Sequence, residues 1–251
     1  MSRRRTWIFE NGLGALGYRV LTEQPLWRRQ IAGLVDHFDP SLARPRVLDL
    51  GCGPGVSSFV LAEALGPDAA VTGVDISAAM IERATRLHAA RHRELTRLRF
   101  LRADALALPF ADASFDVVTG HSFLYIIGDR ARALREIARV LAPGGRLVLM
   151  EPARDGSLVD AAVRAAPRLA AALREPQASV RFAASLVLWR AFSSLAGRMS
   201  PALVDELFAG AGLETVATAP TLEGLGWHCV GRRPLADERA PPPRAKMSDG
   251  T

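Results

Sequence analysis

One stretch limits what this chain can fold into more than any other: the run VLDLGCGPG at residues 47–55. A short apolar, strand-like segment leads into a loop with Gly51, Gly53 and Gly55 at alternate positions, and a helical pattern follows at once. A strand that stops in such a loop leaves backbone N–H groups and a helix N-terminus free to bind a ligand. Glycine suits this loop because the chain turns sharply and because a Cβ atom would hold a ligand away from the backbone.

Strand-like and helix-like segments alternate around this loop. The helices are expected at Val56–Leu65, from an N-cap at Ser77 to about Leu98, and at Asp129–Leu141. This alternation predicts an α/β fold with a doubly wound, mostly parallel sheet, in which ligands bind beyond the carboxyl ends of the strands. The five strands are expected at 46–50, 70–75, 99–102, 115–119 and 146–151.

The flanking segments divide the chain further. Residues 1–44 are expected to form an N-terminal helical extension or cap, whose first 20 residues either pack on the domain or form a flap over its site. In the helix that follows, the residues at helical spacing are expected to lie on the sheet: Trp27, Ile31, Leu34 and Phe38. Residues 45–233 would form the main domain, in which the alanine-rich segment 157–198 is either an ordinary helical part of the core or a lid over an apolar pocket. Its second helix is expected at Val180–Leu195, with large apolar side chains at Phe182, Leu186, Leu188, Trp189 and Phe192. The last segments are expected as two antiparallel strands and a disordered, proline-rich tail, at 213–219, 226–231 and 234–251.

Charge and cysteine content restrict the setting and the partners. The net charge of +6 is compatible with nucleic acid or a membrane surface as a partner. Lys246 is the single lysine and the arginines are scattered, which indicates a composition bias and disfavours nucleic acid. Cys52 and Cys229 form neither a disulfide framework nor a metal-binding spacing, so we expect no metal and a cytoplasmic protein. No apolar run reaches the roughly 18 residues of a transmembrane segment.

The glycine spacing and two acids indicate the kind of ligand. A dinucleotide fingerprint would need a glycine at position 56, which is Val56. Asp49 stands just before the loop, where it would repel a pyrophosphate but attract a cationic group. Asp75 ends the second strand, twenty residues beyond Gly55, where an acid can accept both hydroxyls of a ribose. A nucleoside with a ribose diol and a cationic portion fits, as in S-adenosylmethionine.

Five stretches in this order and spacing resemble the class I S-adenosylmethionine-dependent methyltransferases, in particular the small-molecule branch that includes quinone and lipid methylases. The resemblance covers roughly residues 45–152 and implies a seven-stranded sheet with an antiparallel last strand. The matching stretches are 47–55, 71–76, 102–105 with Leu108-Pro109-Phe110, 114–118 and the run LREIARVLAPGG at 134–145.

The same resemblance implies a cofactor-binding set. Asp49 and the backbone of Gly51 and Gly53 would hold the methionine end, with Gly55 completing the loop. Asp75 would bind the ribose and Ile76 would pack against the adenine. Asp104 would accept from the adenine amino group, Ala105 would donate its N–H to the ring, and His121 would lie beside the cofactor.

Methyl transfer is an in-line displacement that needs alignment, exclusion of water and, for some acceptors, a general base. His121, at the end of the fourth strand, is the best-placed candidate base, and its alternative is a contact with the cofactor or a helix end. Tyr125 and Glu151 are weaker candidates, since Glu151 could orient an acceptor or simply cap a turn. His228 is expected to be packed within a strand.

The acceptor is predicted to be small and lipophilic or aromatic. The run Gly120-His121-Ser122-Phe123 lacks the Asn/Asp-Pro-Pro-aromatic pattern of adenine amino-methylases, and no cysteine stands where cytosine ring-carbon methylases need one. Two alternatives stay open at this point: an RNA or protein methyltransferase, and a non-catalytic S-adenosylmethionine-binding module.

Overall fold

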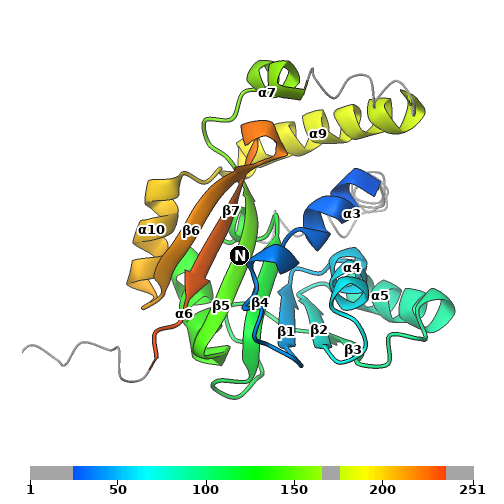
Figure 1. Ribbon diagram of the computed structural model, residues 1–251, viewed down its shortest axis with the longest axis vertical. Coiled ribbons are helices and arrows are strands. Elements are labelled where there is room, and N and C mark those ends of the chain that lie inside the picture. The colour runs from blue at the N-terminus through cyan, green and yellow to red at the C-terminus, as the bar shows by residue number, and fades with distance from the viewer. Residues whose placement is uncertain (1–24, 166–175, 236–251) are drawn as a thin grey trace, which may run out of the picture.

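The computed structural model describes residues 25–165 and 176–235, which form a seven-stranded sheet flanked by helices (Figure 1). The strand order is β3-β2-β1-β4-β5-β7-β6. β7 runs antiparallel to β5 and β6, and all other neighbouring strands are parallel. This confirms the predicted fold, including the antiparallel pair at the end. The strands are β1 Arg46–Leu50, β2 Ala70–Asp75, β3 Leu98–Arg102, β4 Phe115–His121, β5 Leu141–Pro152, β6 Glu214–Thr221 and β7 Gly226–Arg232.

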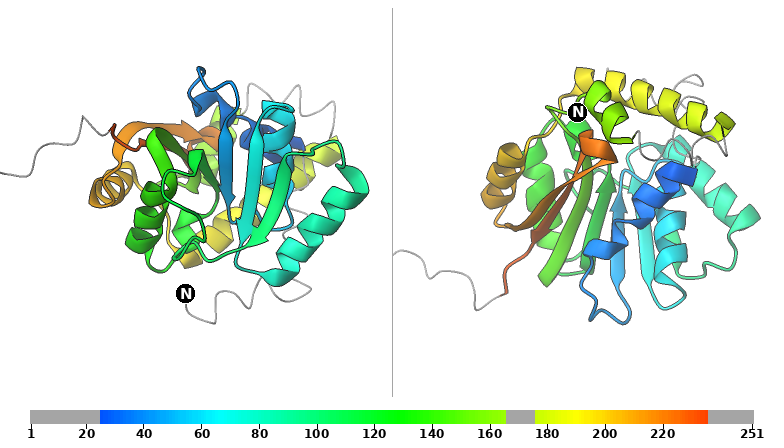
Figure 2. Two further views of the ribbon diagram at one scale, coloured as in Figure 1. Left: turned by 90° about the horizontal axis from the view of Figure 1, so that it is seen from below. Right: turned by 45° about the horizontal axis from the view of Figure 1, so that its top comes forward.

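Helices cover both faces of the sheet (Figure 2). α3 and α4 pack on one face, with α5 beside α4 along β3, and α6 and α10 pack on the other. α7 and α9 lie across the edge at which the parallel strands end (Figure 1). The helices are α3 Pro25–Ala32, α4 Val56–Leu65, α5 Ala78–Arg91, α6 Arg130–Val140, α7 Leu158–Ala165, α9 Pro176–Ala196 and α10 Pro201–Gly210, with short 3-10 turns at η1 Val35–His37, η2 Leu124–Ile126 and η4 Leu222–Gly224.

Apolar residues at helical spacing hold the two layers on the sheet. On α6, Leu134, Ile137 and Val140 are completely buried, because spacing of three residues places them on one stripe. On α3 and the turn after it, Trp27 and Ile31 begin a buried series that continues through Leu34 and Phe38, as predicted. Full burial of such a side chain is worth roughly 1.5–3 kcal/mol.

Two predicted boundaries are wrong. Ser77 does cap a helix, since its Oγ accepts from the N–H of Met80, but α5 ends at Arg91 and not near Leu98. A charged stretch follows Arg91, and the chain turns there before β3 begins at Leu98. β5 begins at Leu141, ahead of the expected Arg146, because the glycine pair inside it is joined to the backbone of Arg233.

The segment expected as a core helix or a lid is helical where it is described, but its buried side is only partly apolar. Trp189 of α9 is buried as expected, whereas Leu188 is exposed. Ser185 and Ser193 complete a buried stripe with Trp189 at intervals of four residues. Small polar side chains therefore face the domain from α9. In the described part of the chain, no helix is long and apolar enough to cross a membrane. The expectations for residues 1–24 and for the tail from 236 lie outside the described residues.

Candidate functional site

The strand order brings the predicted site residues to one edge of the sheet. β3, β2, β1, β4 and β5 are consecutive neighbours and all run in the same direction, so their carboxyl ends are adjacent. Asp49 pairs in register with Gly73, which places it just below the end of β2. Asp75 is the last residue of β2, His121 is the last of β4, and Asp104 follows β3 by two residues.

The three glycines of the loop after β1 all have left-handed backbone conformations. Their φ angles are +65° at Gly51, +53° at Gly53 and +94° at Gly55, a region that residues with a Cβ atom rarely adopt. At two of them, the space that a Cβ atom would fill belongs to the protein itself. An added Cβ would stand 2.9 Å from the ring of Phe123 at Gly51 and 2.9 Å from the ring of Phe100 at Gly55. The predicted turn is confirmed, but close packing of side chains also explains these two glycines.

Asp75 links the glycine loop to the start of α5. One carboxylate oxygen accepts from the N–H of Gly53 at 3.0 Å, and the other accepts from the N–H of Ser77 at 2.8 Å. The residue is half-buried, and burial raises the pKa of its carboxyl while these N–H groups favour the anion. The adjoining Ile76 is also half-buried, and its carbonyl accepts from Arg102.

Asp49 is enclosed beneath the loop. Its side chain is 1 % exposed, and one carboxylate oxygen accepts from the hydroxyls of Ser57 and Ser58, both at 2.6 Å, at the start of α4. The other oxygen lies 3.3 Å from the hydroxyl of Thr119 on β4. Burial raises the pKa of Asp49 to about 6, although these hydroxyls favour the charged form, and the charge of Asp75 adds to the increase.

The raised pKa of Asp49 predicts a pH-dependent stability. Below pH 3.8, the ordinary value, the folded and unfolded chains both hold the proton and the contribution to stability is fully present. As pH rises from there to about 6, the unfolded chain releases the proton first, so the stability is lost. We expect Asp49→Asn to abolish this component: urea titrations should show the wild type losing stability relative to the variant across this window. A difference between the two proteins that is independent of pH would contradict the assignment.

Asp104 lies at the start of a loop that is hydrogen-bonded to side chains of α6. The Asp104 side chain is exposed and accepts from the N–H of Leu106 at 2.9 Å, and the N–H of Ala107 bonds to its carbonyl. Ala105 is half-buried between them. These bonds form a tight turn that presents Asp104 at the surface beside the end of β2, where the N–H of Ala103 bonds to the Asp75 carbonyl.

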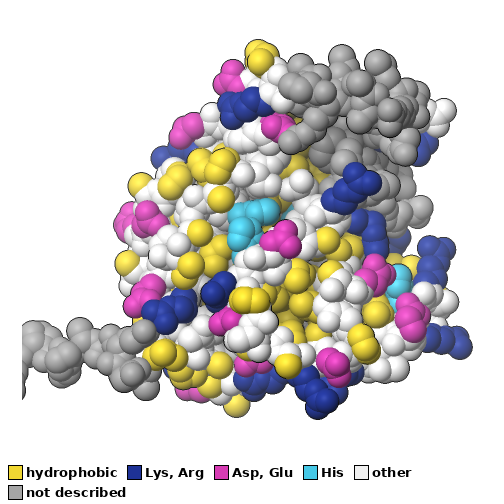
Figure 3. Space-filling view, in the orientation of Figure 1, with side chains coloured by type: hydrophobic (Ala, Val, Ile, Leu, Met, Phe, Trp, Pro, Cys, Tyr) yellow, Lys and Arg dark blue, Asp and Glu magenta, His cyan; other side chains and the backbone are white. Residues whose placement is uncertain are grey.

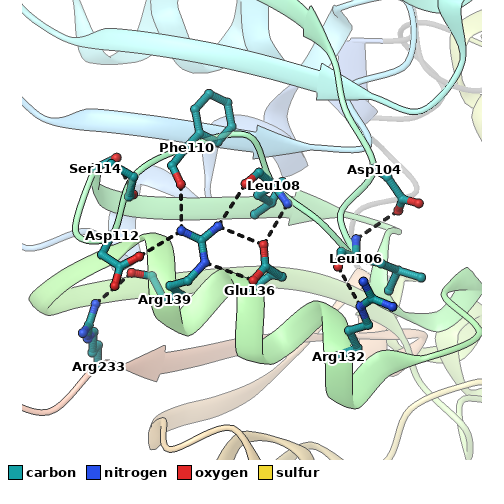
Figure 4. A network of polar contacts seen from close by, with 11 residues as sticks. Asp104, Leu106, Leu108, Phe110, Asp112, Ser114, Arg132, Glu136, Arg139 and Arg233 are labelled. Carbon is teal, nitrogen blue, oxygen red and sulfur yellow. Dashed lines mark hydrogen bonds and ion pairs between the residues drawn. The ribbon is translucent and has the colours of Figure 1, made fainter.

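Two residues of α6 hold the rest of this loop (Figure 4). Arg139 donates to the carbonyls of Leu108 and Phe110 at 2.9 and 2.7 Å. Glu136 accepts from the N–H of Leu108 at 2.8 Å and pairs with Arg139 at 2.9 Å. Two charged residues of the run LREIARVLAPGG, Glu136 and Arg139, therefore hold the loop that follows Asp104. The spacing of the apolar residues in this run does not predict that role.

A surface hollow of about 410 Å³ lies where this loop meets α6. Leu106, Leu108, Arg132 and Glu136 are among the residues that line it. It is built from the rear of the loop and from α6, and none of the strand-end acids lines it. We do not assign the predicted site to this hollow.

His121 is packed among aromatic side chains. Its ring meets Trp27 of α3 edge to face at 5.6 Å, and Trp27 meets Trp189 of α9 at the same distance. The Nε2 atom of His121 is buried and has no hydrogen-bond partner among the described residues. Burial lowers the pKa of His121 to about 4, with a further contribution from His228, so the ring is neutral at physiological pH.

The structure places two further histidines, His37 and His228, beside His121. His121 and His228 both pair in register with Met150, from either side, so they share one face of the sheet. His228 Nδ1 lies 3.0 Å from His37 Nε2. Burial lowers the pKa of His228 to about 4. Histidine side chains reach the surface near the centre of this face (Figure 3). His228 is thus packed within a strand, as predicted, and His37 is a neighbour that the sequence did not indicate.

The weaker catalytic candidates both lie inside the protein. Tyr125 is 3 % exposed and belongs to η2. Glu151 is 1 % exposed, and its carboxylate accepts from the backbone N–H groups of Phe123, Leu124 and Tyr125. This is the turn-capping arrangement that the sequence left as one of two alternatives for Glu151. The two cysteines, Cys52 and Cys229, are buried and free.

The strand order, the glycine loop after β1 and the acids at adjacent strand ends define a class I methyltransferase-type Rossmann-like fold. A crystal structure of a SAM-dependent methyltransferase from Aquifex aeolicus has the same fold, with a TM-score of 0.54 at 15% identity over 84% of this chain and 98% of that one. The family model of the methyltransferase domain matches residues 43–199, and the chain belongs to this family.

Two curated relatives are each similar to about half of the chain. A demethylmenaquinone methyltransferase from Thermus thermophilus is 44% identical over 125 residues, which are 50% of this chain and 53% of that protein. A 27-O-demethylrifamycin SV methyltransferase from Amycolatopsis mediterranei is 43% identical over 121 residues, 48% of this chain and 42% of that protein. The chain therefore spans about half the length of these relatives or less.

Proposed function

We propose that this chain transfers a methyl group from S-adenosylmethionine to a small, lipophilic or aromatic acceptor by in-line displacement. The observation that carries the proposal is the carboxylate of Asp75, which is joined to the glycine loop at Gly53 and to the start of α5 at Ser77. This carboxylate stands at the end of β2, between the loop after β1 and the turn at Asp104.

The donor and acceptor groups at this edge fit an adenosine. A carboxylate offers about four acceptor positions, and the N–H groups of Gly53 and Ser77 each bond to a different oxygen of Asp75, with the N–H of Ile76 also favouring its anion. Neither oxygen is saturated by these contacts, so the carboxylate can still accept from ribose hydroxyls. Ile76 would pack against the adenine, the exposed carboxylate of Asp104 would accept from its amino group, and the Ala105 N–H would donate to the ring.

The methionine end would lie over the loop at Gly51 and Gly53. Asp49 would act there through its charge, because its oxygens are already occupied by hydroxyl groups of Ser57, Ser58 and Thr119. A buried negative charge beneath the loop favours a sulfonium, and a buried charge interacts more strongly than one in water. When bound, the cofactor supplies an activated methyl carbon. The chain then has to orient the acceptor and keep water out.

We place the acceptor between the end of β4 and the helices above it. In this proposal the unit is residues 45–233, α7 and α9 form its lid, and α3 belongs to the N-terminal cap. Trp189 of α9 donates to the Ser122 hydroxyl at 2.9 Å, and Trp27 of α3 donates to Ser185 of α9 at 2.9 Å. These bonds join cap, lid and strand end around His121. The acceptors named for the two curated relatives, a demethylmenaquinone and a demethylrifamycin, support a small-molecule acceptor rather than a nucleic acid.

Incubation with methyl-deuterated S-adenosylmethionine tests the reaction. We expect mass spectrometry to find the labelled methyl group on members of a panel of phenols, quinols and polyketide-like alcohols, and not on RNA or on proteins of a cell lysate. Label on RNA or protein alone would contradict the acceptor class. Binding of the cofactor without transfer to any of these acceptors would favour a non-catalytic module.

His121 is proposed as the general base for acceptors that lose a proton. We expect His121→Asn to lower kcat about tenfold and to leave the affinity for S-adenosylhomocysteine within about twofold. This effect is smaller than is typical for a general base, because a pKa of about 4 makes the imidazole a weak base. His88→Asn, on α5, is the matched control and should change neither quantity. An unchanged kcat in His121→Asn would remove the base from the proposal.

A further inference from the structure

The backbone turn after β4 is held by the end of β5 at four consecutive N–H groups. The N–H of Ser122 bonds to the carbonyl of Met150 at 2.7 Å. The next three, from Phe123, Leu124 and Tyr125, bond to the Glu151 carboxylate at 3.1, 2.7 and 3.0 Å. Consecutive N–H groups of this kind form a concave anion-binding site, and here the anion is a side chain of the protein.

A second residue closes the same turn from its carbonyl side. Arg130, the first residue of α6, donates to the carbonyls of Leu124 and Tyr125 at 3.2 and 2.8 Å. The segment 123–125 is therefore fixed between a buried carboxylate on β5 and a guanidinium on α6. A buried charge costs considerable free energy unless it is fully bonded, so an arrangement of this kind resists displacement.

The clamped turn touches the two parts of the proposed site that must be aligned. The Phe123 ring fills the space next to Gly51, since a Cβ atom added there would lie 2.9 Å from its Cδ2 atom. Ser122 has a strained φ of +56°, and its hydroxyl accepts from Trp189 of α9. Strained residues of this kind persist where the surrounding structure fixes them, often at functional sites.

We propose that Glu151 is a positioning residue: by holding the N–H groups of residues 123–125, it sets Phe123 against the cofactor loop at Gly51 and Ser122 beneath the lid helix α9. This inference rests on the proposed function. Glu151 acts through the turn and does not touch the reacting atoms.

The environment of Glu151 makes its charge depend on pH near neutrality. Burial raises the pKa of Glu151 to about 7, while the three N–H groups and the charge of Arg130 favour the anion. The charge of Glu151 also helps to raise the pKa of the Cys229 thiol on β7. As pH falls through about 7, Glu151 gains a proton and its bonds to the turn lose their charge.

Glu151→Gln tests the clamp directly, because Gln keeps the shape but replaces one carboxylate oxygen by an NH₂ group. Either Tyr125 or the pair Phe123 and Leu124 then loses its acceptor. Native-state hydrogen exchange followed by NMR should show faster exchange at these N–H groups, by about tenfold, with Val47 and Leu48 of β1 unchanged. Unchanged exchange at all three positions would overturn the inference.

Binding supplies the second readout. At pH 8 we expect Glu151→Gln to bind S-adenosylhomocysteine about tenfold more weakly than the wild type. At pH 6 this difference in affinity should be smaller, because Glu151 of the wild type is then protonated. Asp116→Asn is the matched control, since Asp116 also accepts a backbone N–H, from Arg46 at the opposite edge of the sheet. It should bind as the wild type does at both pH values. Equal affinity of Glu151→Gln and wild type at both would overturn the inference.

Arg130→Gln changes the same turn while leaving the Glu151 side chain in place, although it also removes a charge that favours the Glu151 anion. This variant serves if Glu151→Gln fails to fold. It should speed exchange at residues 123–125 and weaken binding in the same direction. No effect on either would count against the clamp. If the wild-type chain does not bind S-adenosylhomocysteine, the proposed function itself is overturned. If the wild type binds it and the variants bind it equally well, only the role of Glu151 is overturned.

Discussion

Replacing Asp75 by alanine is expected to weaken the binding of S-adenosylhomocysteine about thirtyfold, equivalent to ~2 kcal/mol for a charge-assisted contact with two hydroxyl groups. The carboxylate that provides this contact also accepts from the N–H groups of Gly53 and Ser77. The variant should still fold, because Asp75 is half-buried at a strand end and these two N–H groups can form hydrogen bonds with water instead. Isothermal titration calorimetry measures the affinity, and circular dichroism confirms the fold.

Two variants make the Asp75 result specific. Asp205→Ala removes an exposed acid from α10, on the opposite side of the sheet, and should leave the affinity unchanged. Asp75→Asn keeps the shape and one acceptor oxygen, so its affinity should fall between those of the wild type and Asp75→Ala. Global unfolding of Asp75→Ala, or an affinity equal to that of the wild type, would show that this acid serves the fold rather than the cofactor.

Gly51→Ala is expected to lower the free energy of unfolding by about 2–4 kcal/mol and to abolish measurable cofactor binding. Two costs add up at this position. The left-handed φ of +65° disfavours any residue with a Cβ atom, by roughly 1–2 kcal/mol. The new Cβ atom would also stand 2.9 Å from the Phe123 ring, which has to move away from the loop. Urea denaturation measures the first effect and calorimetry the second.

Two other glycines separate these costs. Gly212, in the turn after α10, has a φ of +73° and no atom within 4 Å of the point that a Cβ atom would occupy, so Gly212→Ala should show the conformational cost alone, roughly 1–2 kcal/mol. Gly210 has open space and no left-handed φ, so Gly210→Ala should stabilise the protein by about 0.4–1 kcal/mol. If Gly51→Ala costs no more than Gly212→Ala, contact with Phe123 does not restrain the loop.

The parts of the fold that could be predicted are those with a local pattern. The helix Val56–Leu65 and the loop before it were predicted correctly, because glycines, strand and helix follow one another directly. The position of Asp75 at a strand end followed from an apolar run that stops at an acid. The end of α5 was missed because charged residues after Arg91 are as compatible with an exposed helix as with a turn.

The partners of the site residues depend on tertiary packing and could not be predicted. Ser57 and Ser58 follow Asp49 by eight and nine residues, and only the packing of α4 on β1 brings their hydroxyls to its carboxylate. Glu151 reaches a turn 26 to 28 residues earlier in the chain, which no local pattern signals. On α9 the buried stripe includes serines, so a search for apolar periodicity selected Leu188, which is exposed.

The most direct test of the account is a crystal structure of the chain with S-adenosylhomocysteine. We expect the ribose hydroxyls within hydrogen-bond distance of the Asp75 carboxylate, the adenine between Ile76 and the Asp104 turn, and the sulfur above the glycine loop, on the side of His121. A nucleoside bound elsewhere on the chain, or one whose ribose does not meet Asp75, would contradict the central claim that the carboxyl edge of β1, β2 and β3 is the cofactor site.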